Sequence, residues 1–120
     1  MEREMHPVEE TFKNYLDERF NSDKNISTGK YVHIGTLMSL YRFILQISSD
    51  MFLQIECNIC QMDVTERYAH FHVNSYLFFK NKKIDTYIQD IDLGRNPVLN
   101  KEKAKEIVDE LLNKLNITNL

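Results

Sequence analysis

The chain has 120 residues, 42% of them hydrophobic, which is enough for one domain with its own core. Its 15 Lys and Arg against 18 Asp and Glu give a net charge of -3, so no strong positive field attracts nucleic acid or an anionic membrane. No apolar run has signal-peptide character or reaches the ~18 residues of a membrane span. We therefore expect one cytoplasmic domain over residues 1–120, with its core between residues 7 and 115.

The N-terminal part predicts an amphipathic helix from Pro7 to Phe20. Pro7 suits the first helical position, where its missing N–H is not needed, and Glu9 and Glu10 stand where the helix dipole favours negative charge. The apolar residues recur at helical spacing: Val8, Phe12, Tyr15, Leu16 and Phe20. A polar loop through Gly29 and a short strand over 31–34 are expected to follow.

The stretch 36–48 fits two kinds of structure. Alternate apolar residues would suit one face of a strand, but Ser39, Arg42 and Gln46 also form one narrow polar stripe at helical spacing. We predict a helix here, capped by Thr36. A helix that is apolar over most of its girth must be enclosed, so it is expected to cross the sheet centrally or to form a homodimer interface.

Residues 51–93 predict an antiparallel meander of three strands, because side chains alternate between apolar and polar in each segment. The core face of the first strand is predicted to hold Leu53, Ile55, Cys57 and Ile59. The core face of the second is predicted to hold Ala69, Phe71, Val73, Ser75, Leu77 and Phe79. A turn over 80–83 would set Ser75 opposite Ile88 and Tyr76 opposite Tyr87.

The C-terminal stretch 101–115 has the clearest helical pattern, with Asn100 as its expected cap. Its apolar stripe consists of Ala104, Ile107, Val108, Leu111 and Leu115. We expect this helix to cover one face of the sheet. The fold class is therefore α+β: a three-stranded, or with residues 31–34 four-stranded, antiparallel meander with N-terminal, buried central and C-terminal helices.

Cys57, Cys60, His70 and His72 are residue types that bind zinc. On an unbroken strand the two cysteines point to opposite faces, which disfavours a four-ligand site. In one hairpin register Cys60 lies opposite His70, so any metal would use Cys60, His70 and His72. The preferred interpretation has no metal and no other cofactor.

The outer face of the second and third strands is expected to be unusually aromatic. It would carry Tyr68, His70, His72, Tyr76, Phe78 and Tyr87. Such a face suits a protein interface, while stacking of single-stranded nucleic acid is the alternative. The only dense cationic cluster, Lys80, Lys82 and Lys83, lies at one hairpin tip, so the charge disfavours nucleic acid.

No nucleophile motif or Gly-rich phosphate loop supports an enzyme. The sequence thus predicts a small protein-binding domain that occupies a surface on a partner protein, as an inhibitor, an immunity or anti-defence factor, or an adaptor. The alternative is a metal-binding or single-stranded nucleic-acid-binding protein that uses the His70 and His72 face. A homodimer through the 36–48 helix is a further alternative for the partner.

Overall fold

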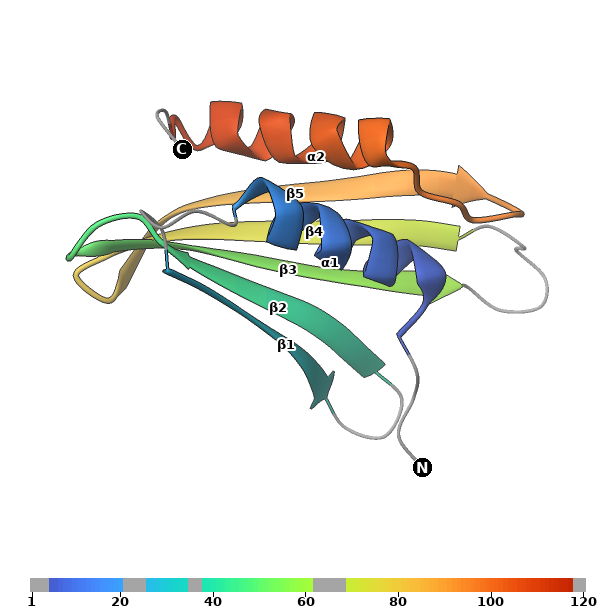
Figure 1. Cartoon of the computed structure of the whole chain (residues 1–120), viewed down its shortest axis with the longest axis horizontal. Coiled ribbons are helices and arrows are strands. Elements are labelled where there is room, and N and C mark those ends of the chain that lie inside the picture. Colours follow the sequence, from blue (N-terminus) through green and yellow to red (C-terminus); the bar gives the residue numbers. More distant parts are fainter. Residues whose placement is uncertain (1–4, 21–25, 35–37, 62–68, 118–120) are drawn as a thin grey trace.

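The computed structural model describes residues 5–20, 26–34, 38–61 and 69–117 (Figure 1). Two helices flank five strands in the chain. In order these elements are α1 (Pro7–Arg19), β1 (Ile26–Ile34), β2 (Met38–Gln46), β3 (Met51–Gln61), β4 (Ala69–Phe79), β5 (Lys82–Gly94) and α2 (Lys101–Lys114). The α+β class is confirmed, although the numbers of strands and helices differ from the prediction.

All five strands form one antiparallel sheet in the order β1-β2-β3-β4-β5, so every strand pairs with its neighbours in sequence. Both helices lie on the same face of this sheet (Figure 1). Helix α1 packs over β2 and β3, and α2 runs beside it towards β5. The fold therefore has two layers, with the core between the helices and one sheet face.

The prediction of a central helix over 36–48 is wrong, because residues 38–46 form strand β2. Tyr41, Phe43 and Leu45 alternate into the core, as the strand alternative required. The residues between them are half-buried on the other face and include Ile44. Because this second face is also partly apolar, the sequence of the segment resembles that of an enclosed helix. Strand β1 also begins earlier than expected, at Ile26.

The core faces of β3 and β4 are confirmed. Leu53, Ile55, Cys57 and Ile59 are buried, and so are the predicted β4 residues as far as Leu77. Phe79, at the end of β4, is 39% exposed. The ring of Phe71 packs edge-on against Phe12 of α1 with centroids 5.4 Å apart, so the same face of the sheet meets the first helix.

The predicted register of β5 is wrong by one residue. A two-residue turn, Lys80 and Asn81, joins β4 to β5, and both residues have positive φ. Beyond an irregularity between Leu77 and Phe78, Ser75 pairs with Tyr87 and Asn74 with Ile88. A one-residue shift turns each side chain to the other face. Tyr87 is thus on the helix side, and Ile88 is on the opposite side.

Both helices begin as their sequences indicate. His6 caps α1: its Nδ1 accepts the N–H of Val8 at 3.1 Å, while Glu9 Oε1 accepts the N–H of His6 at 3.0 Å. Asn100 caps α2 by accepting the N–H of Lys103 at 2.8 Å. None of the helices in the described ranges is long and apolar enough to cross a membrane.

Polar contacts join the two helices to each other and α2 to the sheet. Arg19 of α1 binds Asp109 of α2 at 2.6 Å, and Lys101 binds Glu18 at 2.7 Å. The buried Gln89 of β5 donates from Nε2 to the carbonyl of Ile107, at 3.2 Å, in the middle of α2. These contacts fix the two helices relative to each other and α2 relative to the edge of the sheet.

Candidate functional site: the open face of the sheet

The sheet face opposite the helices is the candidate site, and we call it the open face. No helix in the described ranges covers it (Figure 1). Its residues alternate with the core residues along all five strands. They are Thr28, Lys30, Val32, Leu40, Arg42, Ile44, Gln46, Phe52, Gln54, Glu56, Asn58, Cys60, His70, His72, Asn74, Tyr76, Phe78, Lys83, Thr86, Ile88, Asp90 and Asp92.

One end of the open face is aromatic. Phe52 of β3 lies opposite Phe78 of β4, and their rings stack with centroids 4.5 Å apart and planes 7° from parallel. The Lys83 ammonium lies 5.1 Å from the centre of the Tyr76 ring. Such a pairing of cation and aromatic face is favourable. This end therefore presents broad apolar rings beside a positive charge.

The middle of the open face combines an ion pair with an exposed aliphatic side chain. Arg42 and Glu56 are opposite each other on β2 and β3, and both Nε and Nη2 of the arginine lie 2.7 Å from the same carboxylate oxygen. In the same cross-strand row, Ile88 of β5 is 64% exposed. An isoleucine so exposed on a strand gains little from the fold of its own chain.

The other end carries histidines and acids. His70 Nδ1 lies 3.0 Å from Asp90 Oδ1, and His72 Nδ1 lies 3.9 Å from the same oxygen. The two imidazole rings are nearly parallel, with centroids 6.3 Å apart. Asp92, opposite His70, is exposed and accepts the N–H of Gly94 at 2.8 Å. The end is thus rich in carboxylates.

Cys60, His70 and His72, the residues that any metal was expected to use, lie together at this end of the open face. Cys60 pairs with His70, the register that the metal hypothesis required, and His72 is on the same face. Within the described residues, however, no three His, Cys, Asp or Glu side chains are grouped so that they could hold a metal ion. Instead the carboxylate of Asp90 lies beside both imidazoles.

The predicted aromatic set is only partly assembled. His70, His72, Tyr76 and Phe78 lie together on β4 and face away from the helices. Tyr68 lies outside the described residues. The prediction for Tyr87 is wrong because of the register of β5: the side chain is on the helix side, where desolvation and the carboxylate of Glu110 raise its pKa.

Several residues of the open face were not among the predicted site residues: Ile44, Phe52, Ile88 and Asp90. Phe52 is two residues from Gln54 and therefore lies on the same face of β3, so the alternation of this strand could have predicted Phe52 as an open-face residue. Ile44 was missed because residues 36–48 were predicted to be a helix. Ile88 and Asp90 were missed because the predicted register placed them on the other face of β5.

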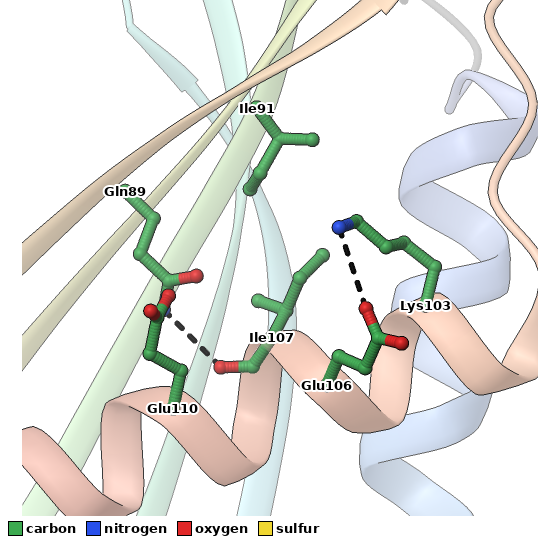
Figure 2. A pocket seen from close by; sticks show the side chains of 6 residues that line it. All are labelled: Gln89, Ile91, Lys103, Glu106, Ile107 and Glu110. Atoms are coloured by element: carbon green, nitrogen blue, oxygen red, sulfur yellow. Dashed lines mark hydrogen bonds and ion pairs between the residues drawn. The ribbon is translucent and has the colours of Figure 1, made fainter.

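A small pocket also lies between β5 and α2, on the helix side (Figure 2). It measures about 180 Å³, and its lining residues are Gln89, Ile91, Lys103, Glu106, Ile107 and Glu110. Lys103 is 3.4 Å from Glu106, and the Gln89 amide is engaged by the helix backbone (Figure 2). This volume is below the ~300 Å³ at which ordinary ligand pockets begin. Among its polar groups, the Gln89 amide binds the backbone of α2, and Lys103 pairs with Glu106.

Comparison of the chain with protein-family models, with curated protein sequences and with solved structures found no significant match.

Proposed function

We propose that this protein acts by binding a partner protein through the open face of its sheet. The observation that carries the proposal is the uncovered apolar surface formed by Phe52, Phe78, Tyr76 and Ile88. An antiparallel sheet with one solvated face normally alternates apolar core residues with polar outer ones. Here the outer residues are aromatic or aliphatic in several rows, which is the pattern of a contact surface.

The polar groups of the open face suit a protein partner as well. Arg42 and Glu56 neutralise each other, so their burial against a partner leaves no isolated charge. Aromatic rings on a rigid sheet lose little side-chain entropy when they are covered. A domain of this kind serves as an inhibitor, an immunity or anti-defence factor, or an adaptor, because occupying a surface requires no chemistry of its own.

Two matched substitutions test this proposal. Ile88→Lys places a charge on the open face, and Val98→Lys places the same charge at a residue that is 74% exposed in the connection before α2. Both side chains are exposed, so both variants should melt close to the wild-type temperature. Proteins captured from cell extract by wild type and Val98→Lys should be depleted about tenfold with Ile88→Lys. Equal capture by all three proteins would contradict the proposal.

Single-stranded nucleic acid is the second candidate, because Lys83 and the stacked rings of Phe52 and Phe78 resemble a base-stacking platform. The carboxylates of Asp90 and Asp92 on the same face oppose a phosphate backbone. Fluorescence anisotropy with a labelled oligonucleotide at two salt concentrations separates the candidates. Binding that weakens with salt and is lost in Tyr76→Ala would favour nucleic acid.

A further inference from the structure

We propose that the partner seated on the open face is a second copy of this chain, packed face to face about a two-fold axis. This inference rests on the proposed function, because it names the partner of the same surface. The resulting dimer would have four layers, with the two sheets inside and the helices outside. The argument depends on how charge is distributed along β5.

The open-face side chains of β5 change from positive to negative along the strand. Lys83 lies near the turn, Thr86 and Ile88 follow, and Asp90 and Asp92 lie at the far end. The stretch is therefore cationic at one end, uncharged in the middle and anionic at the other end. Lys80 and Lys82 at the turn are also exposed and strengthen the positive end.

A two-fold axis that crosses the strands near Ile88 makes this distribution complementary to itself. Rotation about that axis reverses the strand direction and turns the face over, so β5 of one copy lies over β5 of the other. Lys83 of each copy then approaches Asp90 and Asp92 of its partner, and Ile88 meets Ile88. An axis parallel to the strands would instead keep the strand direction and set β5 over the opposite edge strand, β1, so that Lys83 and Asp92 of the two copies would not meet. The charges of β5 therefore favour the axis that crosses the strands.

The area of the open face is adequate for a stable dimer. Five strands spaced about 4.8 Å apart, with roughly nine residues each at about 3.3 Å, cover roughly 700 Å². A standard protein interface buries about 800 Å² on each partner. The centre of the face contributes Ile44 and Ile88, while the Arg42–Glu56 ion pair is neutral within each copy. Association would cover the apolar surface that α1 and α2 leave exposed.

Sedimentation of two charge variants tests the arrangement. Lys83→Asp alone makes both ends of the open face acidic, and Asp92→Lys alone puts lysine at both ends. Each variant should dimerise about tenfold more weakly than wild type. An equimolar mixture should dimerise again, because the two introduced side chains have opposite charges and meet across the interface, as do the Asp92 and Lys83 that each variant retains. Lys114→Asp, at the exposed end of α2, makes the same change in net charge as Lys83→Asp and should leave the dimer intact.

A third variant distinguishes this dimer from pairing of two β5 edges, which would align the same charges. Ile44→Lys lies on β2, far from β5 in the strand order, and should disrupt only the face-to-face dimer. Retention of the dimer in Ile44→Lys would overturn the proposal. So would a mixture of the charge variants that stays monomeric.

The same measurements separate this inference from the proposed function. A wild-type chain that remains monomeric, yet captures another protein in a manner lost with Ile88→Lys, would refute the homodimer and leave the open face as a binding surface. A monomer whose captured proteins do not depend on Ile88 would refute both.

Discussion

The carboxylate of Glu9, in the first turn of α1, accepts the backbone N–H of Ile59 in β3, with Oε2 and N 3.4 Å apart. The described pairing of β2 with β3 stops at Tyr41 and Cys57, and the two strands diverge beyond these residues (Figure 1). Ile59 lies in this divergent part. Glu9, only 2% exposed, therefore supplies an acceptor where the sheet supplies none, and also completes the cap of α1.

Replacing Glu9 by Ala should destabilise the protein by about 2–3 kcal/mol, because it removes the helix cap and leaves a buried N–H without its acceptor. Glu9→Gln keeps an amide oxygen in the same place and should lose less. Urea unfolding measures both changes. Glu10→Ala is the control, since Glu10 is exposed in the same turn and should change the free energy of unfolding by less than about 0.5 kcal/mol. Equal losses for Glu9→Ala and Glu10→Ala would refute the role assigned to Glu9.

Gly29→Ala should also be destabilising, by about 1–3 kcal/mol, because a Cβ at Gly29 would overlap the hydroxyl of Tyr41. Without that overlap, loss of a strand glycine would be expected to stabilise. The Tyr41 hydroxyl is buried and has no hydrogen-bond partner within the described residues. Tyr41→Phe should therefore recover part of the loss in the double variant. Thermal melts measure these changes, with Thr28→Ala as control; a more stable Gly29→Ala protein would contradict the prediction.

The two cysteines should react at different rates. Cys57 is buried in the core, and this burial, together with the charge of Glu9, raises the pKa of its thiol. Only the thiolate reacts readily with iodoacetamide. Cys60 is half-buried on the open face. Intact-mass spectra of the folded protein at pH 8, diluted until the chain is monomeric, should show one modification, at Cys60, and a second should follow in urea. Simultaneous modification of both thiols in the folded protein would count against this packing.

The Asp109 carboxylate should make stability depend on acid pH. Hydrogen bonds from Lys105, at 2.7 Å, and from Arg19 lower the pKa of Asp109. In the unfolded chain its pKa returns to about 3.9. The stabilisation is therefore present above that value and disappears as pH falls through the lower, folded pKa. Because Asp109 is partly exposed, Asp109→Asn should cost at most about 1 kcal/mol at pH 7.

Urea titrations at pH 7 and near pH 2 check this dependence. The difference between wild type and Asp109→Asn should shrink towards zero at the lower pH. Asp50→Asn, in the exposed turn before β3, is the control and should follow the wild type at both values. A difference that stays constant with pH would exclude the charge of Asp109 as its cause.

The sequence predicted the elements whose two faces differ clearly. In α1 and α2 the apolar residues recur at helical spacing, because the other side of each helix faces water. In β3 and β4 they alternate with the mostly more polar residues of the open face, so the core side of each strand could be predicted. In β2 the open-face residues Leu40 and Ile44 are apolar too, so the alternation that marks a strand was weakened. The sheet partners that decide between helix and strand are β1 and β3, and local periodicity contains no information about them.

The candidate site was predicted on β4 and missed on β5 for a different physical reason. Two-residue hairpin turns with positive φ usually contain glycine, whereas this turn consists of Lys80 and Asn81. The turn has two residues where four were expected, and this even difference alone would keep each side chain on its expected face. The irregularity between Leu77 and Phe78 makes the net shift one residue, which exchanges Tyr87 for Ile88 on the open face. Charge complementarity along β5 becomes visible only in the correct register.

The meander also determines the order in which the chain can complete its structure. Each strand pairs with a neighbour in sequence, so the sheet can grow one hairpin at a time with short loops to close. Helix α1 depends on distant residues: Glu9 on Ile59, and Arg19 on Asp109. During synthesis α1 is made before the strands, so Phe12 and Leu16 are enclosed only after most of the sheet has followed. The apolar stripe of α1 therefore stays exposed to water while the surface that will bury it is still being made.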